Sequence, residues 1–156
     1  LQFGLTLTTG CEVTSALTPH ERVAQSLARQ GMMNHLGVRL LSVSVGQVEL
    51  ALPYSDKVTQ QQGGFHGGAM GALADIAGGY AALTVAPEGM EVTTVEYKIN
   101  FLASFQGGEI RAIGRVTKAG KRIIVTTAEL VHVDDSGKRS DCALMQQTLV
   151  PVTKTY

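Results

Sequence analysis

A single carboxylate interrupts the least charged stretch of the chain. Asp75 is the only charged residue between His66 and Glu88, and its neighbours are glycine, alanine and larger apolar residues. A carboxylate in the middle of an apolar helix is costly to desolvate unless it has partners. Because sequences rarely carry such a cost without a use for it, Asp75 is the first candidate for chemistry.

Two glycines, Gly67 and Gly68, stand at the expected start of the same helix. Backbone N–H groups at a helix N-terminus are preorganised donors for an oxyanion or a polarised carbonyl. Asp75 lies eight residues beyond Gly67, or about 12 Å along a helix that rises roughly 1.5 Å per residue. One chain therefore cannot bring both groups to one carbonyl. If both act together, the sequence predicts an obligate homodimer with shared active sites.

The helix expected over residues 67–85 has two unlike faces. The bulky face is expected to pack on a sheet and comprises Met70, Leu73, Ile76, Ala77 and Tyr80. The face around Asp75 carries small residues, namely Gly71, Ala72, Gly78, Gly79 and Ala82. Glycine inside a helix costs about 0.5–1 kcal/mol relative to alanine. Three reasons for these glycines stay open: the approach of a partner subunit, room for a ligand, or tight wrapping of the sheet.

The first part of the chain predicts an arm followed by a helix. Residues 1–17 have weak periodicity and are expected to form a loose arm, with one domain over residues 18–156. The segment Thr18-Pro19-His20-Glu21 contains a capping box and a proline suited to the first helical position. The helix is expected to run to about Gln30 and to end at Gly31.

The remaining segments predict strands on both sides of the central helix. Period-two alternation over residues 38–52, with Gly46 at the turn, predicts a hairpin, and the polar residues 53–65 predict a loop. Four further strands are expected over residues 92–102, 109–118, 122–133 and 141–152. One antiparallel sheet wrapped on one buried helix is an α+β fold.

Composition excludes several classes of function. The chain has 13 basic and 13 acidic side chains and no tryptophan, so nucleic acid and anionic membranes are not expected partners. The two cysteines, Cys11 and Cys142, and the four histidines lack metal-ligand spacing. No metal or organic cofactor is expected. Neither a signal peptide nor a membrane span is evident, which predicts a cytoplasmic protein.

Several short motifs carry a resemblance to a known family. The run Gly64-Phe65-His66-Gly67-Gly68, followed by Asp75, resembles the hotdog-fold acyl-CoA thioesterases of the phenylacetate-pathway type. Residues 94–102, 107–109 and 118–122 resemble the family's later strand and turns, so that the resemblance covers roughly residues 20–152. It implies a single hotdog fold, hydrolysis of an aryl- or medium-chain acyl-CoA, and a homodimer that pairs into a tetramer.

The resemblance also implies roles for four residues in the reaction. Asp75 would be the catalytic carboxylate, acting as general base on water or as nucleophile on the thioester carbonyl. The Gly67 N–H would polarise the thioester oxygen, and the Thr94 hydroxyl would lie near the attacking water. Gln60 stands where the family often has asparagine. Glutamine keeps the amide but is one methylene longer.

Six further residues would contact substrate by the same resemblance. Phe65, His66 and Gly68 flank the oxyanion donor, and His66 has two interpretations, as a structural residue at the helix start or as a general base. Lys118, Lys121 and Arg122 would meet the nucleotide phosphates of CoA, for which basic side chains are suited. Charges beside a hairpin turn also occur simply because they are solvated.

Two other functions compete with the thioesterase. A non-catalytic acyl-CoA-binding or sensing hotdog domain would bind the same ligand without turnover. Regulators of that kind usually carry a DNA-binding segment, and residues 1–35 show one short helix and no basic patch. A hotdog hydratase or dehydratase would need a histidine and acidic pair or a D-x-N-P-type signature, which the sequence lacks.

Overall fold

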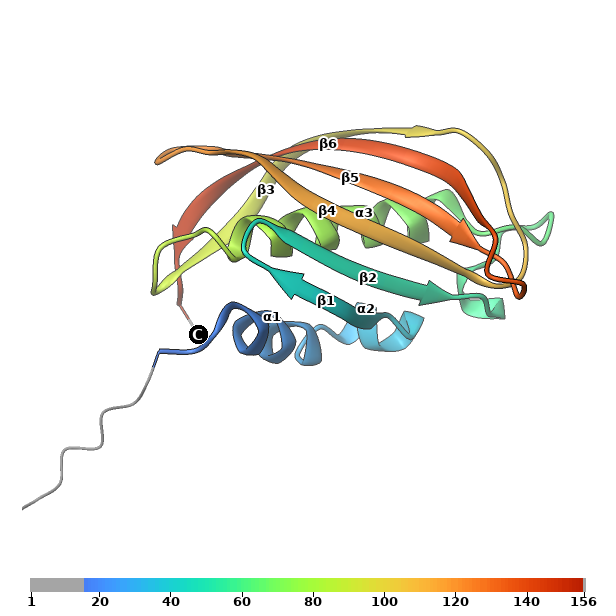
Figure 1. Ribbon diagram of the computed structural model, residues 1–156, viewed down its shortest axis with the longest axis horizontal. Helices are drawn as coiled ribbons and strands as arrows, with labels where there is room; N and C mark the ends of the chain where they lie inside the picture. Colours follow the sequence, from blue (N-terminus) through green and yellow to red (C-terminus); the bar gives the residue numbers. More distant parts are fainter. Residues whose placement is uncertain (1–15, 156) are drawn as a thin grey trace, which may run out of the picture.

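A six-stranded antiparallel sheet and the helix that it encloses make up most of the molecule (Figure 1). The computed structural model describes residues 16–155. The helices are α1 (Pro19–Ala28), α2 (Gly31–Leu36) and α3 (Gly67–Leu83), with the short 3-10 helix η1 (Asp56–Val58). The strands are β1 (Arg39–Ser44), β2 (Gln47–Pro53), β3 (Met90–Phe101), β4 (Glu109–Ala119), β5 (Ile124–Val133) and β6 (Arg139–Thr153). Their order in the sheet is β1-β2-β4-β5-β6-β3.

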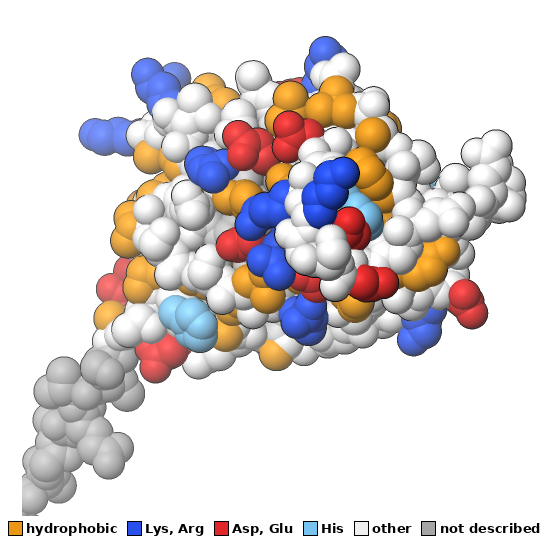
Figure 2. Space-filling model, turned by 45° about the vertical axis from the view of Figure 1, so that its right-hand side comes forward, with side chains coloured by type: hydrophobic (Ala, Val, Ile, Leu, Met, Phe, Trp, Pro, Cys, Tyr) orange, Lys and Arg blue, Asp and Glu red, His pale blue; other side chains and the backbone are white. Residues whose placement is uncertain are grey.

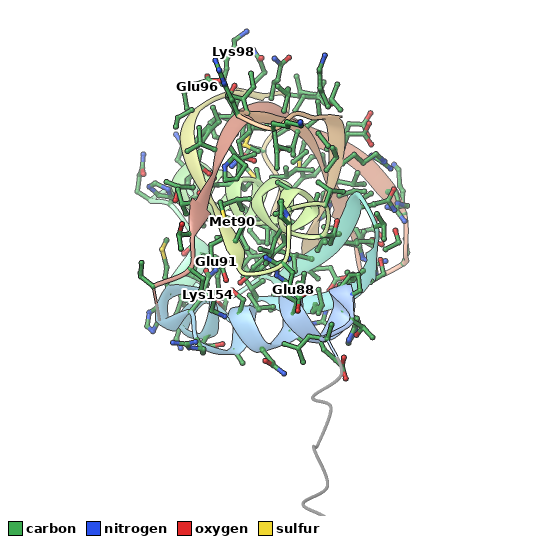
Figure 3. All side chains as sticks on the ribbon, turned by 90° about the vertical axis from the view of Figure 1, so that its left-hand side faces the viewer. Glu88, Met90, Glu91, Glu96, Lys98 and Lys154 are labelled. Atoms are coloured by element: carbon green, nitrogen blue, oxygen red, sulfur yellow. The ribbon has the colours of Figure 1, made fainter. Side chains whose placement is uncertain are left out.

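The sheet curves around α3, and α1 and α2 lie on the side of α3 that the sheet leaves open. Figure 3, a view along α3, shows the helix inside this enclosure. Leu50, Leu73, Ile110 and Leu130 are among the fully buried side chains that fill the space between helix and sheet. Because both faces of α3 are covered, its sequence is apolar nearly all round. The predicted α+β fold, an antiparallel sheet wrapped on one apolar helix, is confirmed.

The N-terminal helix begins as predicted and ends differently. Thr18 caps α1 and exchanges the two hydrogen bonds of a capping box with Glu21. The prediction that the helix continues to Gln30 and ends at Gly31 is wrong, because Gln30 has an extended backbone and Gly31 begins α2. Gly37, with a φ of 78°, terminates α2 in the left-handed conformation. Residues 1–15 of the predicted arm lie outside the described residues, as does Cys11.

The predicted strands and central helix are found within a few residues of their expected bounds. The first hairpin turns at Gly46, which has a φ of 80°. The loop expected over residues 53–65 contains η1, and α3 ends at Leu83 with Thr84 as its C-cap, slightly before the expected end. The four later strands are confirmed in the expected order.

The expected faces of α3 need one correction. The bulky face is predicted to pack on the sheet, but its Tyr80 hydroxyl lies against the N-terminal helices. It donates to Ser26 Oγ of α1 at 3.2 Å and accepts a hydrogen bond from Gln30 Nε2, at the N-cap of α2, at 2.7 Å. The sheet meets residues of both faces at this point, because a Cβ at Gly114 of β4 would overlap the backbone of Ala77, on the bulky face, and of Gly78, on the small face. Tight wrapping therefore explains the small residues at this point of α3.

Candidate active site

Asp75 is held by side chains from two strands. Its half-buried carboxylate accepts hydrogen bonds at Oδ1 from Thr94 Oγ1, at 2.8 Å, and from Gln147 Nε2. The same Nε2 lies 3.2 Å from the carbonyl oxygen of Asp75 and 2.8 Å from Thr94 Oγ1. The structure thus brings the predicted pair Asp75 and Thr94 together, and it adds Gln147, which the sequence analysis did not single out.

The strands place these side chains by their register. Thr94 stands on β3 where the pairing with β6 shifts by one residue, between Thr94 and Glu96. Such irregularities re-aim side chains beside functional sites. On β6 the inward positions are Ala143, Met145, Gln147 and Leu149. Gln147 is the one polar side chain among these inward positions. This break in an otherwise apolar alternation is the sequence signal that points to it.

A pocket of about 340 Å³ opens beside the carboxylate. Its apolar lining comprises Ile76, Leu83, Val92 and Leu149, and its polar lining includes Asp75, Thr94, Tyr80, Ser26 and Gln30. The volume lies at the lower end of the range typical of small-molecule sites, about 300–1,000 Å³. A carboxylate at the wall of such a pocket can activate water or attack a bound electrophile.

The N-terminus of α3 forms a second, separate group. His66 is the N-cap, and its Nδ1 accepts a hydrogen bond from the Gly68 N–H at 2.8 Å. This contact agrees with the structural interpretation of His66. Gly67 is the first helical residue, so its N–H has no acceptor within the helix. The ring of Phe101 lies beside it, since a Cβ at Gly67 would lie 3.3 Å from Phe101 Cζ.

The polar groups of Gln60 form hydrogen bonds within the loop that precedes α3. The Gln60 N–H donates to the Gly64 carbonyl at 2.9 Å, and the Gln60 carbonyl accepts from the Gly63 N–H at 2.9 Å. The Gln60 side-chain oxygen accepts from the N–H of Gln62. Phe65 is buried, with its ring centroid 5.3 Å from that of Tyr54. In one chain these residues shape the loop, and their roles toward substrate stay predictions.

The basic residues predicted to meet CoA lie elsewhere. Lys118, Lys121 and Arg122 are exposed at the β4–β5 hairpin. Beneath the hairpin, Ile124 packs with Ala82, near the C-terminus of α3. In Figure 1 this hairpin and the N-terminus of α3 lie at opposite ends of the molecule. One chain therefore divides the predicted site residues among three places.

Other groups offer less for chemistry. Burial raises the pKa of the Cys142 thiol to about 11, and the nearby Asp141 charge adds to the rise. This thiol is protonated at neutral pH and is a poor nucleophile. Within residues 16–155, no group of three or more His, Cys, Asp or Glu side chains is arranged to hold a metal ion.

The molecular surface carries charges of both signs. Figure 2 shows basic and acidic side chains interspersed on one face. Several are paired, among them Arg115 with Glu129 at 3.0 Å and Arg111 with Glu109 at 2.7 Å. In the described part of the chain, no helix is both long and apolar enough to cross a membrane.

Known proteins share both the sequence pattern and the fold. The sequence profile of the thioesterase superfamily matches residues 62–137. The crystal structure of a thioesterase family protein from Silicibacter pomeroyi has a TM-score of 0.83 at 36% identity, over 87% of this chain and 99% of that one. The chain belongs to the thioesterase superfamily. The expectation of an enzyme of the thioester hydrolase class is thereby confirmed.

Curated relatives of this thioesterase superfamily member carry related names. A 1,4-dihydroxy-2-naphthoyl-CoA hydrolase of Listeria monocytogenes is 33% identical over 119 residues, which cover 76% of this chain and 85% of that protein. A Saccharolobus solfataricus protein named as a candidate esterase is 35% identical over 99 residues, covering 64% of this chain and 70% of that protein.

Proposed function

We propose that this thioesterase superfamily member hydrolyses an aryl- or medium-chain acyl-CoA to the free acid and CoA, as the phenylacetate-pathway type does. The observation that carries the proposal is the Asp75 carboxylate, anchored through one oxygen beside a pocket of about 340 Å³. The name of the Listeria monocytogenes relative, a hydrolase of an aryl-CoA, supports the substrate class.

The reaction needs a base or nucleophile and an oxyanion donor. Asp75 removes a proton from water as the water oxygen attacks the thioester carbon, or its oxygen attacks that carbon directly and water cleaves the resulting anhydride. The Gly67 N–H stabilises the negative charge on the carbonyl oxygen. In the first route the carbon–sulfur bond breaks after water has attacked, and the CoA thiolate takes the proton that Asp75 removed from water. In the second route the carbon–sulfur bond breaks and the thiolate leaves as the anhydride forms, and the water that later cleaves the anhydride supplies the proton for the thiolate.

The two groups must come from two chains, because about 12 Å separates Gly67 and Asp75 on one helix. The open edge of β3 supports this dimer: it is an edge strand, and its exposed side chains include Val95, Tyr97 and Phe101. Exposed apolar edge strands favour pairing with a second chain.

The register of such a pairing can be derived. Thr94 touches Asp75, and Phe101 lies beside Gly67. If two β3 strands pair antiparallel about a two-fold axis, Thr94 can lie opposite the partner's Phe101, which brings Asp75 of one chain toward the partner's Gly67. Pairing of two such dimers into a tetramer stays a prediction.

A thiol-release assay tests the proposal, with aryl, short, medium and long acyl-CoAs as substrates of the wild type and of Asp75→Asn. We expect turnover of aryl or medium-chain substrates and a loss of about 10²–10⁴-fold in the variant, the range typical of a general base. Thermal unfolding and molar mass provide the control for fold and assembly. Equal activity in a folded Asp75→Asn dimer would contradict the mechanism. Thermal stabilisation by an acyl-CoA without turnover would instead support the acyl-CoA-binding domain.

A further inference from the structure

We infer that Gln147 is a positioning residue for Asp75, which it orients so that Oδ2 is the oxygen that reacts. The inference rests on the proposed function, in which the Asp75 carboxylate acts on water or on the thioester. Gln147 lies on β6, 72 residues from Asp75, and its side chain has no exposed surface. Its role would be to hold the carboxylate without touching the substrate.

The two oxygens of Asp75 have unlike surroundings. Oδ1 accepts hydrogen bonds from both Thr94 Oγ1 and Gln147 Nε2. Among residues 16–155, no donor to Oδ2 is found. An oxygen that already accepts two hydrogen bonds has less capacity for a third partner. Oδ2 therefore keeps its lone pairs for a water molecule or for the thioester carbon.

The orientation of the Gln147 amide is set by its neighbours. Its nitrogen faces acceptor atoms, the Asp75 Oδ1 and the Asp75 carbonyl oxygen, together with the Thr94 hydroxyl. A reversed amide would set its oxygen against the two Asp75 oxygens, which is electrostatically unfavourable. Thr126 Oγ1 donates to Gln147 Oε1 at 2.9 Å and completes the pattern. The Gln147 donor to Asp75 is thus fixed from β5 and β6.

The helix carries a glycine where this amide needs room. A Cβ at Gly78, three residues after Asp75, would overlap Gln147 Oε1 and would lie 2.7 Å from Thr126 Oγ1. Burial of an amide costs free energy unless it is hydrogen-bonded. If the site needed packing alone, an apolar residue such as the neighbouring Met145 would suffice. The buried amide, the hydroxyl behind it and the glycine in front of it together indicate a built support for the carboxylate.

Two variants of Gln147 test the inference in the full-length protein. Gln147→Met keeps the approximate volume and removes the donor, and we expect kcat to fall about 10- to 100-fold, because small misplacements of reacting groups have effects of that size. KM should change less than about twofold, since Gln147 does not touch the substrate. The readouts are kcat, KM, thermal unfolding and molar mass.

Gln147→Glu keeps the shape and replaces the donor by a second carboxyl group. When two carboxyl groups lie side by side, the negative charge of the first to ionise raises the pKa of the second. We therefore expect the acidic limb of the kcat/KM profile to move toward neutral pH. The other ionisable groups at the pocket are Glu91, which pairs with Lys154 at 3.7 Å, and Tyr80. These groups are identical in the wild type and in Gln147→Glu, so a shift of the pH profile reports on Asp75 and residue 147.

The controls separate this inference from the proposed function. If Asp75→Asn retains full activity, the proposed function fails. If Asp75→Asn is inactive while folded Gln147→Met and Gln147→Glu keep the wild-type kcat and pH profile, the positioning role alone is overturned.

If both Gln147 variants fail to fold, Thr126→Val decides. It leaves Gln147 in place and removes only the hydroxyl that orients the amide, and we expect about a threefold loss of kcat at unchanged KM, below the full effect of displacement. An unchanged kcat in folded Thr126→Val would then overturn the inference.

Discussion

The middle of α3 and its N-terminus differ in how fully one chain completes them. Around Asp75, Thr94 and Gln147 occupy one carboxylate oxygen, and Thr126 supports Gln147 from behind. At the N-terminus, His66 binds the Gly68 N–H, while the Gly67 N–H has no acceptor within its helix.

The difference follows from physical chemistry. A carboxylate in an apolar helix must find donors in its own chain, or its desolvation opposes folding. A backbone N–H needs no support of that kind, because the helix itself fixes its direction. The carboxylate is therefore prepared by the fold, whereas the Gly67 N–H stays open. In the proposed mechanism this N–H is the oxyanion donor, and a second chain helps to position its ligand.

Gly67→Pro removes the open donor at a helix position that suits proline, and the exposed ring of Phe101, 3.3 Å from the added Cβ, has to shift slightly. Gly67 is the first residue of α3, where proline is favoured, and His66 before it has a φ of −73° and a ψ of 131°, which a following proline tolerates. We expect kcat to fall about 10²- to 10³-fold, the range seen when one oxyanion donor is lost. Steady-state kinetics of the folded variant measures this loss, and wild-type kcat would exclude the Gly67 N–H as donor.

Mixing this variant with Asp75→Asn tests whether the two regions come from different chains. In a mixed dimer with shared sites, one site carries both defects and the other carries none. If chains exchange freely, half of the dimers are mixed, so that roughly a quarter of wild-type activity returns. Each variant kept alone through the same exchange is the control. No recovery in proven mixed dimers would mean that the sites are not shared.

Gly78→Ala tests the support of the carboxylate from the helix side. The added methyl group would overlap Gln147 Oε1, so we expect kcat to fall about tenfold through displacement of the amide. Gly79→Ala is the matched control for helix stability, because its Cβ would meet only Leu149 Cδ2, at 3.9 Å. That variant should raise the free energy of unfolding by up to about 1 kcal/mol, as removal of a helical glycine does. If kcat of Gly78→Ala equals the wild-type value, the Gln147 amide accommodates the methyl group without moving Asp75.

The basic hairpin tests a third region, at the opposite end of the molecule from the N-terminus of α3 (Figure 1). Replacement of Lys118, Lys121 and Arg122 together by alanine should raise KM for an acyl-CoA at least about threefold, since exposed ionic contacts are worth about 0.2–1 kcal/mol each. A thioester of N-acetylcysteamine, which has no nucleotide phosphates, should show no such change. Lys138→Ala with Arg139→Ala, at the β5–β6 hairpin, controls for the lost charge. If the variant has the wild-type KM for each of the two substrates, the hairpin charges do not contact CoA and are simply solvated.

The sequence singles out Asp75 and Thr94, which the structure brings into contact, but it does not single out Gln147. Asp75 is the one charged residue of an apolar helix and is therefore easily noticed. Gln147 resembles any polar residue of a strand until it is known which residues of β6 face inward. Thr126 meets it only through the β5–β6 register. Long-range register of this kind is set by packing of the whole sheet.

The helix faces show a related limit. Periodicity separated the bulky and small sides of α3 but did not say which neighbour covers each side. Tyr80 was expected on the sheet and instead reaches Gln30 beside α1. A helix enclosed by a sheet on one side and by helices on the other buries both faces, so hydrophobicity alone does not tell them apart.

His66→Ala has the smallest expected effect and separates the two interpretations of this histidine. Loss of the N-cap bond to Gly68 should lower the free energy of unfolding by about 1 kcal/mol. His66→Asn restores a side-chain acceptor but cannot act as a general base, so chemical denaturation and kcat together are informative. If His66 is structural, asparagine recovers the stability and any kcat lost with alanine. If asparagine recovers stability while kcat stays as low as in His66→Ala, the imidazole itself takes part in the reaction, and the N-terminus of α3 contributes more than a backbone N–H.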